Sequence, residues 1–304
     1  MISLNVNNEF GKLNKVILGI AQSNGGIPKL DECYDPKSRE HVQNGTFPEE
    51  ANLSDELNQF LNVLKKYNVS VFRPTLIEDY NQIFSRDIAF VIGEKLVVSN
   101  IIKDREKEIN AIENIISQIN PSNIIRLSNK ARIEGGDVII HNDHIFIGYS
   151  KEEDFKEFQV ARTNEIAIEE IKENFSNKKI VAFELKKSDY QAKENALHLD
   201  CCFQPIGKKM AIIYEEGFKR KEDVDYITRL FGEDKLIKIT QQEMYDMNSN
   251  VFSISEDTIV SEIGFKRLNS ILRTKGFKVE EIKFSEIAKM EGLLRCTTLP
   301  LQRQ

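Results

Sequence analysis

The stretch IAFVIGEKLVVS, residues Ile88–Ser99, consists of two short apolar strands joined by a polar turn that begins at Gly93. Two apolar runs separated by a glycine-containing turn are typical of a β-hairpin. The pattern recurs three times, and successive copies start about 49, 66 and 48 residues apart. This is the spacing of a repeated supersecondary unit. The other copies are DVIIHNDHIFIG at 137–148, FQPIGKKMAIIY at 203–214 and VFSISEDTIVSE at 251–262.

A segment with helical periodicity and then a single strand follow each hairpin, so the repeating unit is ββαβ. A fifth and less regular copy opens the chain, with a strand at Lys15–Ile20, a polar insertion through Glu50, a helix near Ser54–Lys66 and a strand from Val69. The other predicted helices are Glu106–Gln118, Asn164–Asn174, Glu222–Phe231 and Phe265–Thr274, and the other single strands begin at Asn123, Lys179, Leu236 and Lys278.

Five units that each leave one sheet face unburied can cover one another by closing into a ring, with the helices outside. We therefore predict an α/β fold, a five-bladed pseudo-symmetric propeller. Closure would pair the terminal CTTLPLQ, Cys296–Gln302, with the first strand at Lys15–Ile20. The alternative is two domains joined near Ser150–Gln159. Because this charged stretch accounts for the longer interval, we interpret it as an insertion and expect residues 1–304 to form one domain.

Composition limits the classes of protein. A hydrophobic content of 40% with 30% charged residues is typical of a globular enzyme. No long apolar run and no apolar leader segment are present, so we expect a cytoplasmic protein without membrane contact. The four cysteines form no CxxC pair, which argues against structural zinc. The net charge of −6 disfavours nucleic acid and is compatible with a cationic ligand.

Polar side chains that could take part in catalysis occur at one position of the unit, between the single strand and the next hairpin. If the units are related by rotation about one axis, equivalent positions converge there, and the dispersed residues line one central pocket. These residues are Asp87 in FSRD, Glu134 and Asp137 in EGGD, His198 and Asp200 in HLD, Asn248 and Asn250 in MNSN, and Cys296 in LLRCTT.

A pocket with one cysteine, one histidine and several carboxylates suggests a specific chemistry. A thiolate is a nucleophile that a nearby imidazole can stabilise, and paired carboxylates hold a planar cation by bidentate hydrogen bonds. Guanidinium is the planar cation that fits. Its delocalised charge makes the carbon a poor electrophile, so covalent catalysis in two steps is chemically sensible.

Each residue alone has a plainer explanation. Cys296 could be a small core residue, His198 could pack or cap, and Asp87 could form a weak ion pair with Arg86. Glu134 could belong to a tight turn formed by the following glycines. Their shared position in the repeat favours the functional interpretation. Elsewhere, His141 and His144 flank a hairpin turn, where a solvated loop is favoured over a metal site, and no GxSxG occurs for a serine hydrolase.

The ordered set FSRD, EGGD, ARTN (161–164), HLD and RCTTLPL (295–301) resembles the arginine deiminase and amidinotransferase superfamily, whose fold is the five-bladed α/β propeller called the pentein fold. The resemblance spans nearly the whole chain and also includes the dimethylarginine dimethylaminohydrolases. It implies that Cys296 is the nucleophile and His198 the proton shuttle. It further implies that Asp87 and Asp200 hold the guanidinium and that Glu134 steadies the imidazole.

The resemblance also implies substrate contacts outside the reacting group. Arg162 resembles the arginine that binds a substrate α-carboxylate, and Arg105 is a second such candidate. Phe84 would pack beside the guanidinium, and Asn250 would add a polar contact. The sequence differs from the deiminases in residues 290–295, MEGLLR, which replace a glycine-rich run before the cysteine. The chain is also too short for the extra helical domain of microbial arginine deiminases.

The implied reaction converts arginine or a derivative to citrulline with release of ammonia or an alkylamine, and it needs no metal and no organic cofactor. Three alternatives remain open. They are an amidinotransferase with an amine acceptor, a citrulline hydrolase that forms ornithine, and a non-catalytic guanidino-binding protein. The expected partner is a small guanidino substrate, and a homodimer is compatible with a compact propeller of this kind.

Overall fold

A computed structural model describes residues 1–304, and its strands form five three-stranded sheets. In every sheet the central strand pairs antiparallel with one neighbour and parallel with the other. The chain is therefore a five-bladed α/β propeller, as the repeat predicts. Four sheets consist of consecutive strands: β3 (Ala89–Ile92), β4 (Lys95–Val98) and β5 (Ile124–Arg126); β6 (Val138–His141), β7 (His144–Tyr149) and β8 (Lys179–Glu184); β9 (Phe203–Ile206), β10 (Met210–Ile213) and β11 (Leu236–Lys238); β12 (Phe252–Ser255), β13 (Thr258–Glu262) and β14 (Lys278–Ile282).

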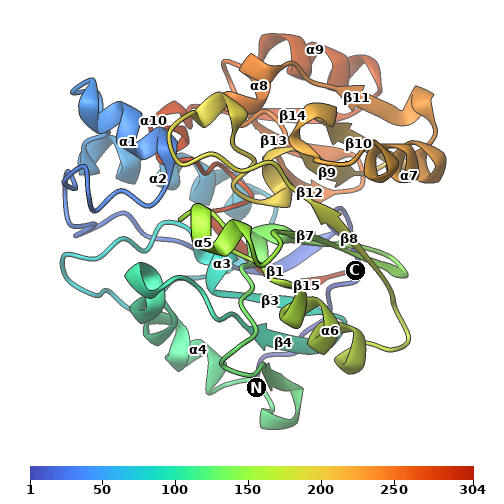
Figure 1. The fold of residues 1–304 in the computed structure, drawn as a ribbon, viewed down its shortest axis with the longest axis horizontal. Helices are drawn as coiled ribbons and strands as arrows, with labels where there is room; N and C mark the ends of the chain where they lie inside the picture. The colour runs from blue at the N-terminus through green and yellow to red at the C-terminus, as the bar shows by residue number, and fades with distance from the viewer.

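The fifth sheet joins the two ends of the chain. β15 (Thr298–Arg303) pairs antiparallel with β1 (Leu13–Leu18), and β1 pairs parallel with β2 (Ser70–Phe72). Figure 1 shows β1 in blue beside β15 in red near the centre of the molecule. The predicted closure is confirmed. Because β15 begins at Thr298, Cys296 lies ahead of the strand rather than within it.

Helices surround the sheets (Figure 1). The longest, α2 (Glu50–Lys66), buries Leu53, Leu57, Phe60 and Leu64, whose spacing of three and four residues places them on one face. None of the helices is both long and apolar enough to cross a bilayer. The remaining α-helices are α1 (Pro36–Gln43), α3 (Ser85–Ile88), α4 (Glu113–Ile116), α5 (Asp154–Glu157), α6 (Glu165–Asn174), α7 (Lys221–Phe231), α8 (Gln241–Tyr245), α9 (Lys266–Thr274) and α10 (Ser285–Ala288).

The predicted second-unit helix, Glu106–Gln118, differs in the structure. Residues Lys103–Ile112 form a 3-10 helix, and only α4 that follows is α-helical. In a 3-10 helix side chains three residues apart lie one above the other. This geometry places Arg105 directly against Glu108, and both side chains are buried. The buried ion pair thus lies within this 3-10 segment.

Candidate active site

The predicted site residues occupy equivalent places in the five units. Asp87 lies in α3, immediately before β3. Glu134 and His198 are the N-cap residues of short 3-10 helices, Gly135–Asp137 and Leu199–Cys201, that precede β6 and β9. Asn250 and Cys296 each lie two residues before the first strand of their sheets, β12 and β15. The shared position in the repeat therefore brings these dispersed residues to one end of the propeller axis.

One small buried cavity collects most of the predicted residues. Its volume is about 10 Å³, room for a single water, so protein side chains fill most of the space that a substrate would need. Glu134, Asp200 and Asn250 lie behind its wall and contact residues that line it. The lining residues are Tyr34, Asp35, Phe84, Asp87, Arg105, Arg162, Leu197, His198, Met290, Glu291, Gly292 and Cys296.

The Cys296 thiol has two polar neighbours. Asn250 Nδ2 donates to Cys296 Sγ over 3.1 Å, and Asp200 Oδ2 lies 3.6 Å from the same sulfur. Burial raises the pKa of the thiol well above its ordinary value, and the nearby carboxylates of Asp200 and Asp87 raise it further. In the free protein the cysteine is therefore held as the neutral thiol. A cation placed between these carboxylates would lower the pKa and favour the thiolate.

His198 lies between two carboxylates. Its Nε2 is 2.8 Å from Glu134 Oε2 and its Nδ1 is 3.8 Å from Asp87 Oδ1. Burial alone would lower the pKa of His198, but Asp87 and Glu134 outweigh it and hold the pKa above its ordinary value. Glu134 also contacts Arg162. Burial alone would raise the pKa of Glu134, but Arg162 and His198 outweigh burial and hold this pKa well below its usual range. The imidazole is thus a proton donor beside a fixed carboxylate.

Arg105 is paired with Asp87, the carboxylate that was expected to hold the substrate guanidinium. Its Nη1 donates to Asp87 Oδ2 over 2.8 Å, and its Nε and Nη2 form a bidentate pair with Glu108 at 2.7 and 2.8 Å. Arg162 points its Nη1 at Glu134 Oε2, 3.2 Å away. Both arginines expected to contact a substrate carboxylate therefore line the cavity, and both are held by buried acids.

Asp200 is likewise paired. Arg295 Nη1 donates to Asp200 Oδ2 over 2.8 Å, and the same guanidinium reaches Glu9 Oε1 at 3.1 Å. Arg295 immediately precedes Cys296, and its side chain is fully buried. The Arg295–Asp200 pair therefore attaches the turn that carries Cys296 to the unit that carries Asp200.

Two glycines are required by close approach at the site. A side chain on Gly136 would put a carbon 2.6 Å from His198 Nδ1, and one on Gly292 would put a carbon 2.3 Å from the Phe84 ring. The EGGD motif is therefore more than a turn, because it lets the imidazole pack against the backbone. Gly292 supplies the flat surface on which Phe84 lies at the edge of the cavity.

Asp87, Glu134 and His198 are also the one group of donors close enough to bind a metal ion, with their ligand atoms within 4.8 Å of one another. Arg105 is already paired with Asp87, and Arg162 is paired with Glu134. A metal ion at this position would therefore compete with two guanidinium groups for its carboxylate ligands.

The sequence predictions missed several residues of the wall. Tyr34 and Asp35 come from the polar insertion, which has no periodicity from which a position could be predicted. Glu291 belongs to the run before Cys296 and has a left-handed backbone, with φ of 55°. Arg295 and Glu108 lie beside predicted residues. The sequence shows that Arg295 and Glu108 are charged, but it does not show that they are buried.

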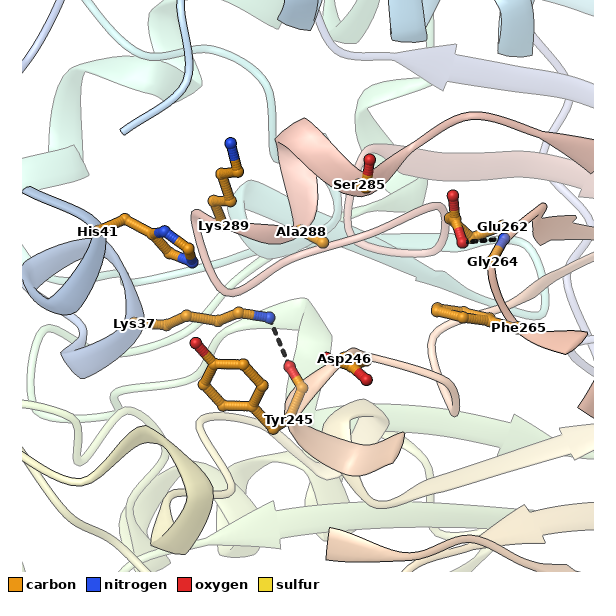
Figure 2. Close-up of a pocket in the computed structure, with 10 residues that line it drawn as sticks. All are labelled: Lys37, His41, Tyr245, Asp246, Glu262, Gly264, Phe265, Ser285, Ala288 and Lys289. Atoms are coloured by element: carbon orange, nitrogen blue, oxygen red, sulfur yellow. Dashed lines mark hydrogen bonds between the residues drawn. The ribbon is translucent and has the colours of Figure 1, made fainter. Parts of the chain in front are cut away.

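A larger groove of about 300 Å³ lies elsewhere, among α1, α8 and α10 (Figure 2). In Figure 2 the Lys37 ammonium group reaches the Tyr245 carbonyl, and Glu262 accepts from the Gly264 amide. No predicted site residue lines this groove. It contains no cysteine, whereas the smaller cavity at the axis contains Cys296 and His198 together, so that cavity is the candidate active site.

Comparison with known proteins agrees with this assignment of fold. The model of the family described as "N,N dimethylarginine dimethylhydrolase, eukaryotic" matches residues 37–303. The uncharacterized protein YkgA of Bacillus subtilis is 30% identical over 297 residues, which cover 97% of this chain and 94% of YkgA. An arginine deiminase of Listeria monocytogenes is 24% identical over 274 aligned residues, in a match that covers 74% of this chain and 62% of the deiminase.

Among solved structures, the chain resembles the N-terminal domain of ArgZ, an arginine dihydrolase from the ornithine-ammonia cycle in cyanobacteria. The TM-score is 0.79 at 17% identity, and the superposition covers 95% of this chain and 98% of that domain. At this level of identity the likeness shows the common fold.

Proposed function

Because the chain belongs to the N,N-dimethylarginine dimethylhydrolase family, we propose that it is a cysteine-dependent hydrolase acting on the guanidino group of arginine or an N-substituted arginine. One observation carries the proposal. A buried cysteine thiol and an imidazole line the same cavity as Asp87, while Asp200 lies 3.6 Å from the sulfur. A guanidinium group held by these two carboxylates would present its carbon to the thiol.

Binding and activation are linked in this arrangement. The carboxylates that keep the free thiol protonated are the groups that would hold the substrate cation. A bound guanidinium neutralises them, so the thiolate forms when the substrate is present and not before. This supports a role for Asp87 and Asp200 both in binding and in controlling the nucleophile.

The proposed reaction has two stages. In the first, the Cys296 thiol loses its proton to solvent as the guanidinium binds, and the thiolate sulfur bonds to the guanidinium carbon. His198 then protonates the departing nitrogen, and ammonia or an alkylamine leaves a covalent thiouronium. In the second, His198 takes a proton from water, the hydroxide adds to the same carbon, and the carbon–sulfur bond breaks. Citrulline is released, and Glu134 orients the imidazole through both stages.

The proposal can be tested by product analysis. We would incubate the protein with arginine, N-methylated arginines, agmatine and citrulline, with and without glycine, and identify products by mass spectrometry. Cys296→Ser is the inactive control. Cys202→Ser is the matched control, because Cys202 is equally buried but contacts the Leu199 carbonyl rather than the cavity.

Each outcome assigns a function. Citrulline with ammonia or methylamine, formed by the protein and by Cys202→Ser but not by Cys296→Ser, supports the hydrolase. Transfer of the amidino group to glycine would make the protein an amidinotransferase, and ornithine formed from citrulline would make it a citrulline hydrolase. No turnover of any compound, with a thiol no more reactive than free cysteine, would reject catalysis and favour a guanidino-binding protein.

A further inference from the structure

Two buried arginines in the interior of the propeller take no part in the proposed reaction and have no acidic partner. Arg86 and Arg303 are 4% and 2% exposed. Buried arginines are almost always paired with an acid, yet the two acids nearest in charge, Glu9 and Asp200, both form their ion pairs with Arg295. Each of the two arginines therefore carries a buried positive charge that no carboxylate of the protein neutralises directly.

Arg86 lies behind the turn that carries Cys296, where only neutral groups accept from it. Its amide donates to the Cys296 carbonyl over 3.0 Å. Its side chain reaches the Arg295 carbonyl and Thr298 Oγ1, both at 3.4 Å, which is longer than the usual N–H···O distance of about 2.7–3.2 Å. Burial and the neighbouring Arg295 guanidinium lower the pKa of Arg86 to about 9, so the group stays charged at neutral pH.

Arg303, at the end of β15, has one edge of its guanidinium without a partner. Its Nη1 donates to the Gly11 carbonyl over 2.7 Å, and its Cζ lies 5.0 Å from the centre of the Phe252 ring. Its Nε and Nη2 are buried and have no hydrogen-bond partner. Arg105 uses the same two nitrogens to hold the Glu108 carboxylate. The free edge of Arg303 is therefore the edge with which arginine binds anions.

The charges around these residues do not balance. Arg86, Arg295 and Arg303 all lie close enough to Glu9 to act on it: burial would raise its pKa, but the three guanidinium groups together lower it to about 2. Glu9 is therefore ionised. With Asp200 as the second anion, three buried cations face two buried anions, and one positive charge is left over. An uncompensated buried charge is costly to a fold.

We propose that the Nε–Nη2 edge of Arg303 binds a chloride ion, which compensates the excess positive charge that Arg303 shares with the nearby Arg86. A monovalent ion matches the single excess charge, whereas sulfate or phosphate would bring too many negative charges. A spherical ion also takes up little more space than a water molecule, which suits donors that are fully buried. The site lies outside the cavity that contains Cys296, so the inference does not depend on the proposed function.

Thermal unfolding in two sodium salts tests the site in solution. Chloride would be exchanged stepwise for gluconate, an organic anion too large for a buried site, at constant ionic strength. Because the ion binds only the folded protein, Tm should rise with chloride along a saturable curve, by roughly 3–6 °C at about 100 times the dissociation constant. Equal Tm values in the two salts at every concentration would overturn the proposal.

Arg303→Met assigns the effect to its residue. In gluconate this variant should be at least as stable as the parent, because it removes an unpaired buried charge, and in chloride it should lose the rise in Tm. Arg229→Met is the matched control, since Arg229 is exposed on α7, and it should keep the rise. A rise that persists in Arg303→Met, or a variant that is destabilised equally in both salts, would show that Arg303 is held by protein contacts alone.

Crystals of the unmodified protein grown in bromide locate the ion without a variant, so the proposal stays testable if Arg303→Met does not fold. Bromide replaces chloride and scatters anomalously, and an anomalous peak is expected in contact with Arg303 Nε and Nη2. The lack of a peak at this edge would overturn the site. A peak there, with the same Tm in bromide as in gluconate, would mean binding at crystal concentration only and would also reject the proposal.

Discussion

Arg105 and Asp87 form a buried ion pair, 2.8 Å between Nη1 and Oδ2, in the wall of the cavity that contains Cys296. The protein's own guanidinium therefore occupies a carboxylate that the proposed function assigns to the substrate guanidinium. Glu108 holds the other edge of Arg105 through two hydrogen bonds, so Arg105 can release Asp87 without losing all of its partners. Substrate binding then becomes an exchange of one guanidinium for another.

Arg105→Gln should change the affinity for two ligands in opposite directions. Methylguanidinium, which has no carboxylate, no longer has to displace Arg105 from Asp87, and we expect it to bind about tenfold more tightly, as expected for a charge-assisted hydrogen bond. L-Arginine should bind more weakly if Arg105, once released, contacts its carboxylate. Calorimetry on the Cys296→Ser background measures both. Unchanged affinity for methylguanidinium would show that the Arg105 pair does not compete with the ligand.

Asp200→Asn should make the thiol more reactive and the enzyme less active. Removing the carboxylate 3.6 Å from the sulfur removes a cause of the raised pKa of Cys296, and a fall of one in that pKa increases the thiolate fraction about tenfold. Alkylation by iodoacetamide at pH 8 should therefore accelerate. Arginine turnover should fall about a hundredfold or more, because the guanidinium is no longer oriented. Slower alkylation in the variant would contradict this account of the thiol.

The repeat was predictable because each hairpin is one contiguous segment of the sequence, with an apolar run on either side of a short turn. The same repeat predicted that Asp87, Glu134, His198 and Cys296 converge, since equivalent positions of a closed ring meet at its axis. The pairs that hold these residues were not predictable. Arg295 contacts Glu9 across 286 residues of sequence, and nothing local in either segment indicates the partner.

The contribution of the polar insertion was also beyond sequence reasoning. Asp35 and Pro36 form a clear helix start, but a cap signal says nothing about which surface the helix will cover. Tyr34 and Asp35 reach the cavity because the segment folds over it, and this tertiary placement leaves no periodic pattern. The 3-10 helix that carries Arg105 was expected to be α-helical, because the local charge pattern does not distinguish the two helix types.

Protonation of His198 should stabilise the fold in a definite pH range. Because its pKa is raised in the folded protein above the ordinary value of 6.5, its contribution is fully present below pH 6.5 and is lost as pH rises through the folded pKa. The free energy of unfolding in urea should therefore exceed that of His198→Gln by more at pH 6 than at pH 9. A folded pKa that is higher by one corresponds to about 1.4 kcal/mol of this difference.

Glu134→Gln is the control for this pH dependence, because it removes a carboxylate that raises the pKa of His198 while keeping the side-chain shape. In that background the effect of His198→Gln on the free energy of unfolding should vary less with pH. The descending limb of kcat against pH should also move to lower pH, since the imidazole loses its proton earlier. An unchanged limb would mean that another group supplies the proton.

Asn250 should support catalysis by fixing the Cys296 turn. Its Nδ2 donates to the sulfur at 3.1 Å, and its Oδ1 accepts from the amides of Arg295 and Cys296 at 3.0 and 3.1 Å. Asn250→Ala leaves these buried amides without that acceptor, so unfolding should become easier by about 1–3 kcal/mol. A displaced thiol should lower kcat by about a hundredfold, with a smaller effect on KM.

The matched control lies two residues away. Asn248 is also buried, but its Oδ1 has no hydrogen-bond partner, and the side-chain hydrogen bonds of the Cys296 sulfur are to Asn250 and Asp200. Asn248→Ala should therefore leave kcat within about threefold of the parent, since it does not reposition the reacting sulfur. Thermal unfolding and steady-state kinetics on both variants separate packing from positioning. A similar fall in kcat for the two would show that the segment matters for folding and that Asn250 has no special relation to Cys296.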